Sequence, residues 1–225
     1  MTESEWLSGT DPAVLLESLD DRMSHRKLRL FACACCRRLW PLLTDVRYRQ
    51  AVEVAERFAD QQATAKDLHR ARRNAEVVRA AVTPGYVGTR MSRAYALGFA
   101  VVYAARKDGE LRAAVRSLMG DAQVAAGGEE GPGAAGHEGA AQADLLRCVV
   151  GNPFRPGTAD PEWLTATVLS LARQVYEGRA FDVLPILADA VQDAGCDNER
   201  VLNHCRAAGV HARGCWAVDL LLAKG

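Results

Sequence analysis

The fold depends on one stretch, Leu28-Arg-Leu-Phe-Ala-Cys-Ala-Cys-Cys-Arg-Arg-Leu-Trp40. It holds no helix-breaking residue before Pro41, and Ser24 can cap a helix that begins just ahead of it. At 3.6 residues per turn, its apolar side chains form two adjacent stripes, which end in Leu39 and Trp40. Other parts of the protein pack around most of the circumference of a helix with two such stripes. We therefore predict a central helix over residues 28–40.

Helix start and stop signals recur on both sides of this stretch. Asp11-Pro12, Asp45, and Thr64 with Asp67 are typical of helix starts, and Gly195 is typical of a helix end. No run of alternating β-branched residues is long enough for a sheet, and no repeat of fixed period occurs. The sequence predicts an all-α fold, an irregular bundle of about ten helices.

A glycine-rich stretch suggests how the chain is divided. Residues 125–139 read Ala-Ala-Gly-Gly-Glu-Glu-Gly-Pro-Gly-Ala-Ala-Gly-His-Glu-Gly. Such a stretch can bury too little apolar surface to offset the conformational entropy that it would lose on becoming ordered. We predict a flexible loop there. Residues 1–124 then form a helical N-terminal part around the central helix. Residues 140–225 form a helical C-terminal part that packs on the first, so that the two make one compact domain.

Charge is balanced overall but unevenly spread. The chain has 28 Lys and Arg against 28 Asp and Glu, whereas residues 1–120 carry 20 against 14 and residues 121–225 carry 8 against 14. The favoured interpretation is that the two halves complement each other in one fold. The alternative is a basic surface that binds nucleic acid through the arginines of residues 26–79, for which one helix face supplies Arg70, Arg72, Arg73 and Arg79.

Cysteine usage indicates the compartment. Seven cysteines are an odd number in a chain long enough to fold without disulfides. The sequence opens with no charged and apolar leader pattern, and no apolar run reaches the roughly 20 residues that span a bilayer. We predict a cytoplasmic protein with reduced thiols and no membrane association.

Soft metal-binding side chains gather near the end of the chain. Thiolates and imidazoles are the ligands that Zn²⁺ takes in tetrahedral sites. The cluster consists of Cys196, His204, Cys205, His211 and Cys215. Cys33 and Cys36 on the central helix could add two ligands if the C-terminal part packs there. The spacings match no known zinc motif, so the favoured interpretation is that these cysteines are small buried hydrophobes.

The same residues allow a second chemistry. Cys215 is expected in the first turn of the last helix, where backbone N–H groups lower the pKa of a thiol. His211 could act as its base, which makes Cys215 and His211 the candidate catalytic pair. Gly214 lies between them and argues against the helical turn that would put both on one face. The sequence therefore assigns no catalytic residue, and Cys215 and His211 stay an alternative.

Several strings resemble a family of uncharacterised proteins from planctomycete-type bacteria. They are Arg26-Lys-Leu-Arg-Leu-Phe-Ala-Cys-Ala-Cys-Cys-Arg-Arg-Leu-Trp40, Gly151-Asn-Pro-Phe-Arg-Pro156, and His204-Cys-Arg206 followed by His211-Ala-Arg-Gly-Cys-Trp216. The likeness covers roughly the first 60 and the last 80 residues. It implies a bacterial, intracellular protein, and it implies no activity, because none is assigned to the family.

These observations favour a non-enzymatic helical module for protein interaction or regulation, whose partner is another protein. The sequence has no cofactor fingerprint, no nucleophile elbow and no clear metal spacing, so no cofactor is expected. The first alternative is a zinc-binding or reactive-thiol protein that uses the Cys and His residues of 196–215. The second is a nucleic-acid-binding protein that uses the arginine-rich N-terminal helices.

Overall fold

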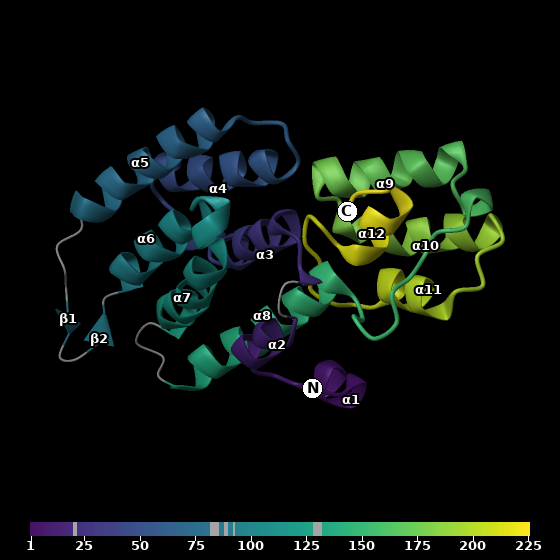
Figure 1. Cartoon of the computed structure of the whole chain (residues 1–225), viewed down its shortest axis with the longest axis horizontal. Coiled ribbons are helices and arrows are strands. Elements are labelled where there is room, and N and C mark those ends of the chain that lie inside the picture. Colours follow the sequence, from purple (N-terminus) through teal and green to yellow (C-terminus); the bar gives the residue numbers. More distant parts are fainter. Residues whose placement is uncertain (20–21, 82–85, 88–89, 92, 128–131) are drawn as a thin grey trace. The chain divides into compact units, whose positions relative to one another are not determined.

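A computed structural model of the chain describes residues 1–19, 22–81, 86–87, 90–91, 93–127 and 132–225. Within these ranges it forms twelve α-helices and one small antiparallel hairpin (Figure 1), which confirms the predicted all-α class. None of the helices described is both long and apolar enough to cross a membrane. The chain divides into two compact units, the N-terminal unit (residues 9–143) and the C-terminal unit (residues 1–8 and 144–225).

The N-terminal unit is built around the predicted central helix. Helix α3 (His25–Arg38) contacts α4 (Val46–Ala59), α6 (Arg93–Ala104) and α7 (Asp108–Gly127), and residues 28–36 are all buried. The other elements are α2 (Pro12–Ser18), α5 (Ala65–Ala81), the hairpin of β1 (Tyr86–Val87) and β2 (Arg90–Met91), and the first part of α8 (Pro132–Val150). Helix α3 covers residues 28–38 of the predicted central helix, whereas Trp40 lies in a short 3-10 turn at Trp40–Leu42 that follows it.

The helix starts expected from the sequence are seen in the hydrogen bonds. The Asp11 side chain accepts from the N–H groups of Ala13 and Val14, and Ser24 accepts from the N–H of Lys27. Thr64 and Asp67 cap each other reciprocally: each backbone N–H donates to the other's side chain, at 3.1 and 3.2 Å. Each bond satisfies a helix-end donor that the helix itself leaves unpaired.

Most of the loop expected over residues 125–139 is helical in the structure, which corrects that prediction. Helix α7 continues to Gly127 and α8 begins at Pro132, while residues 128–131 lie outside the described ranges. The composition of this stretch suggested that the entropy cost of ordering it would be too large. Buried contacts of α8 offset that cost. Glu138 in α8 pairs with Arg38 at 3.0 Å, and Gln142 donates to the carbonyl of Met119.

The two units also differ in extent from the parts predicted. The division falls at residue 143/144, within α8, and residues 1–8 belong to the C-terminal unit although Gly9 belongs to the other. Packing of the two parts into one compact domain stays a prediction.

The C-terminal unit has a core of its own, rich in cysteine. Its helices are α1 (Glu3–Ser8), the last part of α8, α9 (Ala166–Gly178), α10 (Leu184–Asp193), α11 (Glu199–Arg206) and α12 (Trp216–Leu221), with 3-10 turns at Pro161–Trp163 and Phe181–Val183. Helix α10 contacts α9 and α11, and α12 contacts the same two helices. Four cysteines lie in the hydrophobic cluster among them, Cys148, Cys196, Cys205 and Cys215. All seven cysteines are buried, and none of them forms a disulfide.

One carboxyl group in the N-terminal unit gives a pH-dependent prediction. Burial raises the pKa of Asp121 in α7 from 3.8 to about 6. Because the folded-state pKa lies above the unfolded value, the stabilising effect of protonation is complete below about pH 4 and is lost as the pH rises through about 6. We expect Asp121→Asn to raise the free energy of unfolding at about pH 7.5 by about 1 kcal/mol, after allowance for partial exposure.

Urea titrations of the wild type and the variant at acidic and neutral pH measure this effect. The gain should vanish below about pH 3, where the wild-type carboxyl group is itself protonated in both the folded and the unfolded state. The exposed Glu53 provides a control, since Glu53→Gln removes one charge without burial. An equal gain from both substitutions would attribute the effect to net charge and contradict the prediction.

Candidate metal centre

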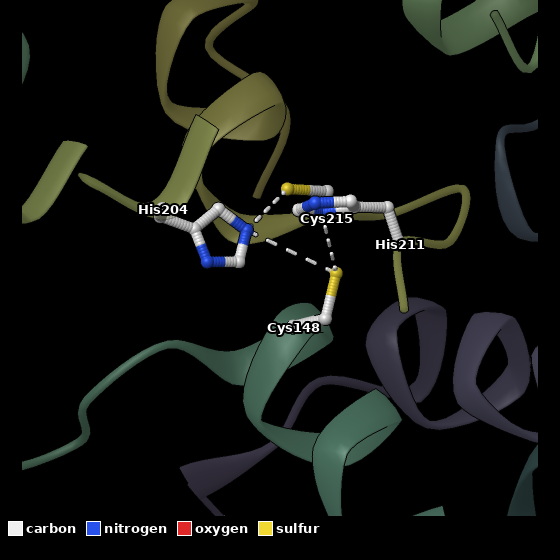
Figure 2. A group of neighbouring side chains, drawn as sticks. All are labelled: Cys148, His204, His211 and Cys215. Atoms are coloured by element: carbon white, nitrogen blue, oxygen red, sulfur yellow. Dashed lines mark hydrogen bonds between the residues drawn. The ribbon is translucent and has the colours of Figure 1, made fainter. Parts of the chain in front are cut away.

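Four side chains with metal-binding atoms meet in the C-terminal unit: Cys148, His204, His211 and Cys215. Their ligand atoms all lie within 4.8 Å of one another. Figure 2 shows Cys148 at the end of its helix, facing the other three side chains. The cysteines are 3% and 1% exposed, and the histidines are half-buried. The donor set is thus two sulfur and two nitrogen atoms.

The separations suit a small tetrahedral site. The distance from His204 Nε2 to Cys215 Sγ is 3.0 Å, that from His204 Nε2 to Cys148 Sγ is 4.0 Å, and that from His211 Nδ1 to Cys148 Sγ is 3.8 Å. Around a tetrahedral Zn²⁺, with its usual bond lengths, sulfur and nitrogen ligands lie about 3.6 Å apart. The observed distances fall on both sides of that value. Small side-chain adjustments would therefore bring the four atoms to ligand geometry.

The surroundings of the two imidazoles also suit metal binding. His211 Nε2 lies 3.4 Å from the carbonyl oxygen of Ala207, to which it can donate a proton. That bond favours the tautomer in which Nδ1, the atom facing the cluster, is unprotonated and able to ligate. The Phe181 ring stacks on His211, and Trp216 lies beside His204 with ring centroids 5.3 Å apart. These rings give the site a partly apolar surround.

A tight turn places Cys215 beside the histidines. The Cys215 N–H donates to the carbonyl of Ala212 at 2.9 Å, and Gly214 has a φ of 88°. Glycine takes this left-handed conformation at little cost, whereas other residues are strained there. The turn brings the chain back toward His211 without the helical turn that the sequence analysis required. Gly214, taken as evidence against the pair, is the residue that allows it.

The cluster also changes the acidity of its own groups. Burial by itself would raise the pKa of the Cys215 thiol, but hydrogen bonds with Cys148, His204 and His211 hold that pKa well below its usual range. Burial would lower the pKa of His211, and the contact with the Cys215 sulfur more than offsets this and raises it. The site therefore favours a thiolate at Cys215, and a thiolate is the form that binds metal.

Of the residues proposed from the sequence, three come together: His204, His211 and Cys215. Cys196 and Cys205 do not join them; they lie in the hydrophobic cluster, where burial raises the pKa of Cys205 to about 12. Both therefore fit the interpretation of small buried hydrophobes.

Cys33 and Cys36 belong to the N-terminal unit, and neither is among the four residues of the cluster. The Cys33 thiol lies 3.8 Å from the carbonyl of Val52, which is in the same unit. Burial raises the pKa of both thiols well above the usual range.

The fourth member, Cys148, was missed by sequence reasoning. It precedes His204 by 56 positions and lies near the end of α8, between an arginine and two valines. No local pattern distinguishes it from a buried hydrophobic cysteine. The sequence does predict that this helix ends at Gly151, three residues after Cys148. That position near a helix end was the one signal that could have drawn attention to Cys148.

The arrangement bears on the candidate catalytic pair as well. Cys215 is 1% exposed, so a substrate would have no direct access to its sulfur. That sulfur also lies 3.0 Å from Nε2 of His204, which was not a member of the proposed pair. Binding of a metal ion uses all four side chains, whereas a nucleophile–base pair would use two and leave the others unexplained.

The arginines proposed for nucleic-acid binding are mostly engaged within the N-terminal unit. Arg70 pairs with Asp67, and Arg72 with Glu76. Arg79 packs over the ring of Phe99 at 4.5 Å. Further pairs join arginines of α3 to carboxylates, namely Arg26–Asp60, Arg29–Asp108, Arg37–Glu56 and Arg38–Glu138. These pairs neutralise much of the positive charge on which a nucleic-acid surface would depend.

Comparisons with protein-family models, with curated proteins and with solved structures find no match to this chain. The resemblance to a planctomycete-type family stays a prediction.

Proposed function

We propose that the chain is a zinc-binding protein whose C-terminal unit holds one Zn²⁺ through Cys148, His204, His211 and Cys215. The observation that carries the proposal is the convergence of two thiols and two imidazole nitrogens within 4.8 Å. Two of the ligands come from helices and two from the segment between α11 and α12. The ion would fasten that segment to the ends of α8 and α11.

Zinc fits this donor set better than other common metals. Two thiolates with two neutral imidazoles in tetrahedral array are typical of structural zinc sites. Calcium and magnesium prefer oxygen ligands, and iron–sulfur clusters are usually held by four cysteines. The lowered pKa of Cys215 supports the thiolate form, and the bond from His211 Nε2 to Ala207 fixes the ligating nitrogen.

A structural role follows from the number of ligands. Catalytic zinc keeps one position open for water or substrate, whereas four protein ligands fill a tetrahedral ion completely. Such an ion stabilises a fold and does no chemistry, which supports the non-enzymatic role expected from the sequence. Recruitment of another protein, also expected from the sequence, stays a prediction.

Metal content tests the proposal. Protein purified without a metal-affinity column should contain one zinc per chain by elemental analysis. Replacement of zinc by Co²⁺ should give the intense visible bands of a tetrahedral ion and the near-ultraviolet bands of bound thiolate. Cys148→Ala should abolish both signals, because it removes one of the two sulfur ligands.

Cys205→Ala is the matched control. Cys205 and Cys148 are buried to the same degree in the same hydrophobic cluster, and only Cys148 faces the histidines. The control variant should keep its zinc and its cobalt spectrum. Absence of stoichiometric metal from the wild type, or equal retention of metal by both variants, would overturn the proposal.

A further inference from the structure

A cleft opens on the C-terminal unit beside the candidate metal centre. Its volume is about 900 Å³, toward the upper end of the range for small-molecule sites. Its walls come from α1, from the end of α8 and the residues that follow it, from α11 and from the start of α12. His204 lines the cleft and is one of the four residues of the metal cluster. Trp216 also lines the cleft and directly follows Cys215, another member of the cluster.

The cleft is positively charged although its unit is acidic. The C-terminal unit carries 8 Lys and Arg against 12 Asp and Glu, a net charge of −4. Three of those eight cations, Arg147, Arg155 and Arg200, line the cleft with a single carboxylate, Glu3. The residues that line the cleft therefore carry a formal charge of +2, and Asp144, which pairs with Arg147, lies outside this lining. Such a concentration on an acidic unit favours one small anion over a long polyanion, which the surrounding charge would repel.

Two of the arginines are held in place by the backbone. Arg147 donates to the carbonyl of Trp6 at 3.1 Å and pairs with Asp144 at 2.9 Å. Arg200 donates to the carbonyl of Arg155, and its guanidinium lies 5.8 Å from the centroid of the Trp216 ring. A side chain that is already ordered loses less entropy when it binds a ligand. The guanidinium groups are thus preorganised around the cleft.

A carboxylate of the chain itself, that of Glu3, is already bound by polar groups of the cleft. The Glu3 carboxylate accepts a hydrogen bond from the Asn152 amide at 2.7 Å and one from Arg155 Nε at 3.1 Å. The hydrogen bond from Asn152 is the main cause that holds the pKa of Glu3 below its ordinary value. This end of the cleft is therefore complementary to a carboxylate or phosphate oxygen.

We propose that the cleft binds a small organic phosphomonoester, with its phosphate on the guanidinium groups of Arg147, Arg155 and Arg200 and its organic part along Trp216. A phosphomonoester carries nearly two negative charges at neutral pH and three terminal oxygens, so it can engage three guanidinium groups, whereas a carboxylate carries one charge and two oxygens. Arginine forks bind phosphate oxygens in pairs. The volume leaves room for an organic group as large as a nucleoside.

The proposal goes beyond zinc binding and is tested on the metal-loaded protein. Isothermal titration compares adenosine 5′-monophosphate, ribose 5-phosphate, inorganic phosphate, adenosine and acetate. We expect a phosphomonoester to bind with a Kd of about 1 mM or tighter, and adenosine and acetate to bind far more weakly. Arg200→Gln should weaken phosphomonoester binding roughly 10- to 100-fold, because a charge-assisted hydrogen bond is lost.

The control is Arg173→Gln, which removes an exposed arginine of α9 that does not line the cleft. It should leave the affinity unchanged. Zinc content is measured for each variant, so a loss of affinity with full zinc is separated from a collapse of the metal centre. Three outcomes would overturn the inference: no saturable binding of either phosphomonoester to the zinc-loaded wild type, equal affinity for acetate, or equal weakening by the control.

Discussion

Removal of zinc with a chelator is expected to lower the unfolding temperature of the C-terminal unit by roughly 15–30 °C. An ion that binds only the folded state stabilises it by about 4 kcal/mol when free zinc exceeds the Kd about 1,000-fold. For a unit of this size, each kcal/mol shifts the unfolding temperature by about 4–8 °C. The effect should be large because three of the four ligands lie on or after the short helix α11.

Calorimetry with and without chelator measures the shift, and hydrogen exchange assigns it to a unit. Amides of residues 199–221 should lose protection first, since the ion fastens this segment. The Cys148→Ala variant is the control: with its metal site already lost, the chelator should not change its unfolding temperature. A shift confined to residues 9–143, or none at all, would contradict a structural role for the ion.

Much of the fold could be predicted because it depends on local signals. The apolar stripes of residues 28–40 and the capping pair of Thr64 and Asp67 lie within a few positions of one another in the chain. Residues 125–139 could not be predicted in this way. Glycine content suggested a loop, and the contact between Glu138 and Arg38, 100 positions apart, lies beyond a local pattern.

The candidate site was predictable only in part, for the same reason. His204, His211 and Cys215 are close in sequence, so their chemistry could be recognised even though the turn at Gly214 was misjudged. Cys148 reaches them only through the packing of α8 in the C-terminal unit. Cys196 and Cys205 lie equally near in sequence, but neither is among the four side chains that converge. Which cysteine faces the histidines is a property of the tertiary structure.

Trp6→Ala is expected to destabilise the C-terminal unit by about 3–5 kcal/mol, as the loss of a fully buried large aromatic side chain usually does. Trp6 in α1 is 0% exposed, and its Nε1–H donates to the carbonyl of Gly151 at 3.1 Å. Gly151 has a φ of 76°, and a side chain there would meet the Trp216 ring at 2.9 Å. Trp6 therefore supports the turn at Gly151, which follows Cys148 by three residues.

Urea unfolding of three variants tests this account. Trp6→Phe keeps most of the buried volume but leaves the Gly151 carbonyl without its donor, so it should cost only about 1–2 kcal/mol. Leu7→Ala changes the neighbouring residue, which is 55% exposed, and should change stability by less than about 0.5 kcal/mol. A loss from Trp6→Ala no larger than that from Leu7→Ala would show that α1 does not support the unit.

Cobalt spectra of the same variants connect this contact to the metal centre. Gly151 follows Cys148 by three residues, and Trp216 directly follows Cys215, so both sulfur ligands adjoin the region that Trp6 packs against. We expect Trp6→Ala to weaken Co²⁺ binding by more than Trp6→Phe does, because the larger deletion allows the Gly151 turn to shift. If Trp6→Ala binds Co²⁺ as tightly as Leu7→Ala does, the metal centre is rigid without α1, and only the stability effect remains.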